Sequence, residues 1–107
     1  MNLWLDDQRP APEGFTWVKT VKEAIALLST GQVEFASLDY DIAWDPGGTD
    51  EDWENRRTGM GVVLWMEENR VWPRRGVVVH SMNPVGAKRM QARLKDFRMS
   101  LKPCEMV

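Results

Sequence analysis

The only histidine of the chain, His80, stands beside the hydroxyl of Ser81, between a run of three valines and the dipeptide Asn83-Pro84. An imidazole titrates near neutral pH, so it can give or take a proton beside a reacting group. Ser81 and Asn83 can donate hydrogen bonds to phosphate oxygens, helped by the amide groups of a helix start. These residue types indicate acid–base chemistry on a phosphate ester. His80 can equally be a structural histidine bonded to a carboxylate, and Asn83 can serve as an N-cap alone.

Acidic side chains follow two other apolar runs, at Asp6 and Asp7 and again at Asp39 and Asp41. Carboxylates gathered at one place repel one another unless a cation or protons intervene. Oxygen ligands on loops suit Mg²⁺, a hard ion that keeps waters for a phosphate to replace. We therefore predict that these four aspartates hold Mg²⁺ or another divalent cation. The alternative is that some of them cap helices or face water.

Two basic side chains are placed to assist. Arg9 follows the first acidic pair, and Lys102 precedes Pro103 near the end of the chain. Arginine can hold a phosphate through two parallel hydrogen bonds, whereas lysine acts as a point charge. We predict that Arg9 and Lys102 bind phosphate oxygens together with Ser81 and Asn83. Either base can instead merely screen the acids.

A scaffold must bring these residues together. Apolar runs typical of strands cover residues 2–5, 15–19, 33–38 and 76–80, and a short fifth strand is expected at 99–101. Helix starts are predicted at the capping box that begins with Thr20, after Thr58, and at Asn83-Pro84. Strands that are apolar on both faces and alternate with helices predict an α/β fold, a parallel sheet covered on both sides.

Ligands of such sheets bind beyond the carboxyl ends of the strands, where the candidate residues stand. We therefore expect them to converge on one edge. The acidic segment 42–57 is predicted to be a loop, and loops of this length are usually functional or mobile. Its Trp44 and Trp53, together with Trp17, can stack on bases or pack as lid or core, and the sequence leaves both open.

The composition is that of one soluble domain. With 107 residues, 43% hydrophobic and 28% charged, the chain can bury a core without a disulfide. The lone Cys104 excludes an internal disulfide and a thiolate zinc site. No apolar run approaches the ~20 residues of a membrane span, and no signal-peptide core is present, so a cytoplasmic location without a membrane partner is the default expectation.

The net charge of −2 conceals a division between the two halves of the chain. Residues 1–55 carry three basic and twelve acidic side chains, a net −9, whereas residues 56–107 carry eleven basic and four acidic, a net +7. This asymmetry suits a site where acids hold a metal and nearby bases hold a phosphate. The other interpretation is that the halves neutralise each other in the folded chain.

The order of these residues resembles the receiver domain, the Asp-phosphorylated module of two-component signalling. It has an acidic pair, a later Asp, a hydroxyl and a final Lys-Pro, each after a successive predicted strand. The stretches LDDQRPAP, SLDYDI, Thr58-Gly59 and HSMNPVG resemble one branch more specifically, the cyclic-phosphate processing receiver-like domains. That branch is associated with RNA-end repair and with 2′,3′-cyclic phosphates. The resemblance spans the chain and implies a doubly wound, five-stranded sheet of order 2-1-3-4-5, a loop in place of the first helix, and a metal on the first acids.

The sequence thus predicts a metal-dependent enzyme that hydrolyses or opens cyclic phosphates at RNA or nucleotide ends, with His80, Asp39 and Asp7 as catalytic residues. An ordinary phospho-acceptor needs neither His80 nor Asp41, which favours chemistry on a bound ester. Two alternatives remain. One is a signalling receiver phosphorylated at Asp39, and the other is a non-catalytic interaction or inhibitor module encoded by a virus or mobile element. The natural substrate and the oligomeric state are left open.

Overall fold

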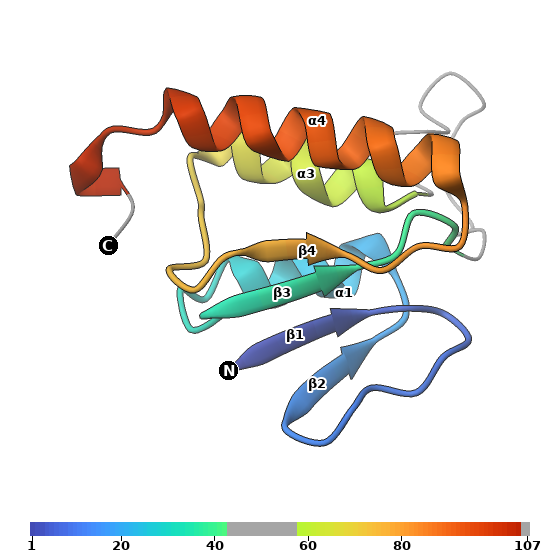
Figure 1. Ribbon diagram of the computed structural model, residues 1–107. Coiled ribbons are helices and arrows are strands. Elements are labelled where there is room, and N and C mark those ends of the chain that lie inside the picture. The colour runs from blue at the N-terminus through green and yellow to red at the C-terminus, as the bar shows by residue number, and fades with distance from the viewer. Residues whose placement is uncertain (43–57, 106–107) are drawn as a thin grey trace.

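The structure is a computed structural model that describes residues 1–42 and 58–105 (Figure 1). The described residues form four parallel strands, β1 (Asn2–Leu5), β2 (Phe15–Val18), β3 (Phe35–Leu38) and β4 (Val77–Val79), in the order β2-β1-β3-β4. They also form the helices α1 (Val21–Leu28), α3 (Gly59–Asn69) and α4 (Pro84–Ser100) and the short 3₁₀-helix η2 (Pro103–Glu105). The α/β class with a parallel sheet is confirmed. The predicted loop 42–57 beyond Ile42 lies outside the described residues, as do Trp44 and Trp53.

Each helix begins where local hydrogen bonding favours it. The Thr20 side chain caps α1 by accepting a hydrogen bond from the backbone N–H of Glu23 at 3.1 Å, and its hydroxyl donates to the Glu23 carboxylate at 3.0 Å. Thr58 caps α3, and the Asn83 side chain caps α4 by accepting from the backbone N–H of Gly86 at 3.0 Å. The predicted helix starts are therefore correct.

The helices cover one face of the sheet. Alternate residues of β1 and β3, among them Leu3, Leu5 and Leu38, are completely buried beneath α1, α3 and α4, which pack against one another. On the other face Val78 is 46% exposed. The expectation of helices on both faces was wrong for the described residues. The reason is the connection from β1 to β2, which runs over the second face as a loop instead of a helix.

The predicted fifth strand is not found among the described residues. Met99 and Ser100 continue α4, and Leu101 is its C-cap. The apolar stripe of α4 explains the extension, because Leu94, Phe97 and Leu101 recur at helical spacing and are all buried in the same core. The helix therefore runs past the residues that a strand would need, and β4 remains at the edge of the sheet.

The direction of α4 decides which residues reach which end of the sheet. All four strands are parallel, so their carboxyl ends share one edge, and α4 begins there and runs back toward the opposite edge (Figure 1). The N-terminus and the 3₁₀-helix η2 consequently lie on the side where the strands begin. None of the helices in the described ranges is long and apolar enough to cross a membrane.

Candidate functional site

Three side chains from three different strand ends meet at the carboxyl edge. Potential ligand atoms of Asp6, Asp39 and His80 all lie within 4.8 Å of one another. Each residue directly follows its strand, and the ladder continues by one step, since Asp39 N–H donates to Leu5 and His80 N–H donates to Leu38, both at 3.0 Å. The parallel register therefore brings three residues that are far apart in the sequence to the same height at the edge of the sheet.

Asp6 organises the loop that follows β1. Its Oδ1 accepts hydrogen bonds from the backbone N–H groups of Gln8 at 2.9 Å and Arg9 at 2.8 Å, a local turn typical of aspartate. This turn directs the Arg9 guanidinium back toward the acids, with Nε 2.9 Å from Asp6 Oδ2 and Nη2 3.5 Å from Asp39 Oδ2. Arg9 thus lies at the predicted edge, where it bridges two carboxylates and screens them, the alternative that the sequence left open, while phosphate binding by Arg9 stays a prediction.

His80 is held on three sides. The hydroxyl of Ser37 lies 2.7 Å from Nδ1, and Asp6 Oδ2 lies 3.1 Å from Nε2. The indole of Trp4 stacks on the imidazole with ring centroids 3.8 Å apart and an interplanar angle of 5°. Because Trp4 and Ser37 are register partners, both side chains project from the same face of the sheet. The ring orientation is therefore set by neighbouring strands.

Sequence reasoning did not find Ser37 or Trp4 as part of this site. A signal for Ser37 exists, since it is the one polar residue of its strand and is buried. A buried hydroxyl needs a hydrogen-bond partner. Ser37 stands two residues before Asp39, so both side chains point to the same face of the sheet. Trp4 likewise stands two residues before Asp6, so its side chain is expected on the same face as that of Asp6. Neither signal names His80 as the partner, because the β3–β4 register was not known.

The two carboxyl groups differ in their proton affinity. Burial favours the neutral acid in both, and Asp39 is only 5% exposed and Asp6 1%. For Asp6 this burial is outweighed by hydrogen bonds from the backbone of Arg9 and Gln8 and from His80, so its pKa is lowered. For Asp39 burial prevails over a hydrogen bond from Ser81, and the nearby negative charge of Asp6 adds to it, so its pKa is raised.

Burial also acts on the imidazole. It disfavours the charged ring and lowers the pKa of His80, although the hydrogen bond to Asp6 and the charges of Asp39 and Asp6 oppose the shift. The neutral ring is thus the favoured form at pH 7. With Nε2 facing the Asp6 carboxylate, the neutral ring carries its proton on Nε2 and accepts the Ser37 hydroxyl proton at Nδ1.

A cleft of about 380 Å³ opens above this cluster. Its lining contains the four aspartates that were predicted as metal ligands, Asp6, Asp7, Asp39 and Asp41, together with Gln8, Arg9 and Met82. Asn83 reaches the same place, with Nδ2 3.4 Å from Asp41 Oδ1, and Ser81 Oγ accepts a hydrogen bond from the Asn83 backbone at 3.1 Å. The predicted residues from the first, third and fourth strand ends therefore surround one cleft.

Lys102 is not part of this site, and its predicted position was wrong. It follows the C-terminal end of α4 at the opposite edge, where its backbone N–H donates to Glu105 at 3.0 Å. Arg70, which ends α3, holds Ser100 and Glu105 at that edge. The cause is the missing fifth strand, since only a strand after α4 would bring the chain back to the carboxyl edge.

The donor set of the cleft fits a hard divalent cation. Four carboxylates line it, and the described residues of the lining supply a single positive charge, that of Arg9. Burial chiefly, and then the nearby charge of Asp6, raise the pKa of Asp39, and a bound cation would stabilise its charged form. Oxygen ligands of this kind are those that Mg²⁺ prefers. A cation bound between Asp6 and Asp39 would compete with the Arg9 guanidinium for the same oxygens.

Comparison with protein families gives one match. The model of the cyclic-phosphate processing receiver domain matches residues 1–96. The chain belongs to this family. No curated protein and no solved structure matches the chain. The match to the cyclic-phosphate processing receiver family covers every residue that lines the cleft.

Proposed function

We propose that this protein is a metal-dependent phosphoesterase that opens or hydrolyses 2′,3′-cyclic phosphates at RNA or nucleotide ends. The observation that supports it most is the single imidazole, which is oriented by Ser37 and Trp4 and directs Nε2 at the carboxylate of Asp6, one of the acids that line the cleft. A phospho-accepting receiver has no use for a fixed proton donor at this point. The family name points to the same substrate class.

In this proposal His80 acts on the ribose oxygen that leaves phosphorus. Transfer of the Nε2 proton to the 2′ or 3′ oxygen requires the protonated ring, which is the minor form at pH 7, because a neutral imidazole is far too weak an acid. Burial lowers the pKa of His80, and this makes the protonated ring a stronger acid. Asp6 keeps the ring positioned and stabilises its charged form during the transfer.

The remaining residues bind the phosphate. The guanidinium of Arg9, the hydroxyl of Ser81 and the side-chain amide of Asn83 are the donors at the cleft that can reach its non-bridging oxygens. Asp6, Asp7, Asp39 and Asp41 are the residues that would hold Mg²⁺ or another divalent cation. Such an ion, when bound, neutralises phosphate charge and polarises the phosphorus.

The direct test is incubation with a 2′,3′-cyclic nucleotide and with an RNA that ends in a cyclic phosphate, with and without Mg²⁺, while the monoester is measured. We expect monoester to form in the presence of the ion. The His80→Ala variant should bind substrate but lose about 10²–10⁴ in turnover, the usual contribution of acid–base catalysis. Lys102→Ala is the matched control and should keep full turnover. Unchanged hydrolysis in His80→Ala would remove the assignment.

The signalling alternative predicts a different product. A small phosphodonor would leave a covalent phosphoryl group on Asp39, and the adduct would be absent in Asp39→Asn. The position of Lys102 at the opposite edge argues against it, because the family resemblance that suggested a phospho-acceptor assigned a lysine to the cleft. Mass spectrometry of the intact protein after incubation separates the two proposals.

A further inference from the structure

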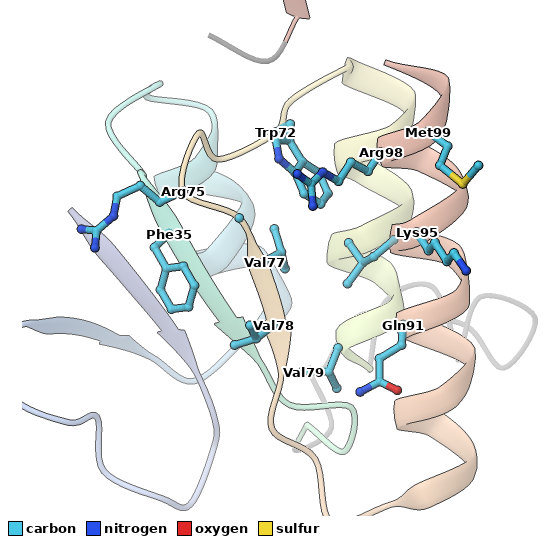
Figure 2. Close-up of a pocket in the computed structure, with 12 residues that line it drawn as sticks. Phe35, Trp72, Arg75, Val77, Val78, Val79, Gln91, Lys95, Arg98 and Met99 are labelled. Atoms are coloured by element: carbon cyan, nitrogen blue, oxygen red, sulfur yellow. The ribbon is translucent and has the colours of Figure 1, made fainter. Parts of the chain in front are cut away.

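A groove of about 780 Å³ lies between β4 and α4, away from the acid-lined cleft (Figure 2). Its floor is apolar, because Val77 and Val79 of β4 point toward α4 and the buried Leu94 of that helix also lines the groove. Val78 points the other way, toward Phe35 on the uncovered face of the sheet. The groove therefore wraps around the free edge of a strand.

The backbone of β4 leaves one side unpaired. Ala36 N–H donates to Gly76 C=O at 3.2 Å and His80 N–H donates to Leu38 C=O at 3.0 Å, so Gly76 and His80 use the side that faces β3. Because successive residues of a strand alternate, the N–H and C=O groups of Val77 and Val79 face the groove. In the part of the chain that the structure describes, no strand pairs with this side. A row of free donors and acceptors is a template for another strand.

The charges around the groove have one sign. Arg75, Lys95 and Arg98 line it, and no acidic side chain does. Within residues 1–42 and 58–105 none of the three takes part in an ion pair, and the Arg98 guanidinium lies over the Trp72 ring, 5.9 Å from its centroid. A basic rim around an apolar floor complements a segment that carries both acidic and apolar side chains.

The described part of the chain does not supply that segment itself. Residues 99–101, expected beforehand to form a fifth strand, belong to α4 and its cap, and Glu105 is held by Arg70 through Oε2 at 2.9 Å. A second copy of the chain is also disfavoured. Pairing two β4 edges would bring two sets of Arg75, Lys95 and Arg98 against each other without an acidic partner.

We propose that the free edge of β4 binds an extended, acidic segment of another polypeptide as an additional strand. Its backbone pairs with Val77 and Val79. Because the side chains of a strand alternate between its two faces, its carboxylates face α4 and meet Lys95 and Arg98, whereas its apolar side chains lie on the other face beside Val78 and Phe35. A segment of five residues, about 17 Å long, spans the edge. Repeated main-chain pairing and an apolar floor favour a polypeptide over a nucleic acid. The proposal is independent of the proposed activity, because the groove shares no residue with the acid-lined cleft.

The test uses the whole protein and a labelled seven-residue peptide in which glutamate and valine alternate. We expect saturable binding by fluorescence anisotropy, and at least ~10-fold slower amide hydrogen exchange at Val77 and Val79, as expected for newly paired edge amides. Two peptide controls accompany it. One replaces each glutamate by lysine, and the other carries N-methyl groups on alternate amides, which removes the donors of a pairing strand. Neither should bind.

Charge reversal on the protein gives a second, independent measurement. The double variant Lys95→Glu/Arg98→Glu changes two exposed side chains of the groove and should weaken binding by roughly 10-fold, since exposed charge pairs contribute little individually. Lys88→Glu changes an exposed residue of the same helix outside the groove and should leave binding unchanged. Both variants should retain the cyclic-phosphate turnover of the unmodified protein, so a failure here is distinct from a failure of the catalytic proposal.

Four results would overturn the proposal. The first is no binding of the acidic peptide, and the second is equal binding of the lysine or N-methylated peptide. The third is tighter binding of a seven-nucleotide single-stranded RNA that displaces the peptide. The fourth is a dimer in sedimentation that protects Val77 and Val79 by itself, which would assign the edge to a second copy.

Discussion

Two carboxylates at opposite edges of the sheet have opposite pKa shifts. At the edge where α4 ends, the partly buried Glu105 receives two hydrogen bonds from the Arg70 guanidinium and one from the Lys102 backbone, and its pKa falls to about 2. At the carboxyl edge, burial and the neighbouring Asp6 raise the pKa of Asp39. The surroundings of Glu105 stabilise its negative charge, whereas the surroundings of Asp39 disfavour its negative charge.

This difference distinguishes ion pairs that only join parts of the surface from charged groups that form a functional site. The described ion pairs remote from the cleft, such as Arg74 with Glu34 and Arg93 with Glu67, involve exposed groups that lose little solvation and contribute little stability. Asp6, Asp39 and His80 are buried together and share partners. Clusters of perturbed titratable groups in a cleft are typical of functional sites. Four variants test whether the two edges differ in this way.

The largest effect on stability is expected for Asp6→Ala. The substitution removes the acceptor of the Gln8 and Arg9 backbone N–H groups and the partner of His80. Loss of a buried, multiply bonded acceptor should lower the free energy of unfolding by about 2–3 kcal/mol. Urea denaturation monitored by tryptophan fluorescence measures it. A loss below ~0.5 kcal/mol would show that Asp6 is no better integrated than a surface acid.

Ser37→Ala should come next and should act on turnover. Without the hydroxyl, His80 keeps its stack on Trp4 but loses the 2.7 Å contact that orients Nδ1. We expect turnover of a 2′,3′-cyclic nucleotide to fall about 10-fold, equivalent to about 1.4 kcal/mol, with an unchanged KM. Ser37→Thr retains the hydroxyl and should recover most of the rate. Equal loss in both variants would indicate a packing role instead.

Asp39→Asn should stabilise the protein at neutral pH while activity is lost. Because the folded pKa of Asp39 is raised, folding favours its protonated form. Its contribution is therefore fully present below pH 3.8 and is lost as the pH rises through the folded pKa. The neutral amide removes this loss, so the variant should gain about 1 kcal/mol at pH 7 and nothing at pH 3. Thermal unfolding with a chelator present, at both pH values, measures the difference. A destabilised variant at pH 7 would contradict the assignment.

Glu105→Gln should have the smallest effect. Arg70 is exposed and Glu105 is only partly buried, so water and salt screen the loss, and the free energy of unfolding should change by less than ~1 kcal/mol. The change should shrink further in 1 M salt, where the screening length is ~3 Å. Turnover should not change. A loss comparable to that of Asp6→Ala would remove the contrast between the two edges.

Local features were predictable because their causes are local. The caps at Thr20 and Asn83 depend on hydrogen bonds within four residues, so the sequence alone places both helix starts. The acids at Asp6 and Asp39 were placed at one edge by a rule about parallel sheets, which needs only the strand ends. The long-range contacts of His80 were not predictable, since they depend on which strands are neighbours and in what register.

The amino-acid sequence by itself determined the class of fold, the starts of the helices and the residue types that end each strand. The reason is that hydrophobic periodicity, helix capping and strand direction are properties of short segments. Only the tertiary structure decided that Ser37 and Trp4 orient His80, that Lys102 lies at the far edge, and that β4 has a free side. The contacts of His80 depend on which strands are neighbours and in what register, and the other two features depend on where α4 stops relative to the sheet. That length is set by the burial of Phe97 and Leu101 in a core built from the whole chain.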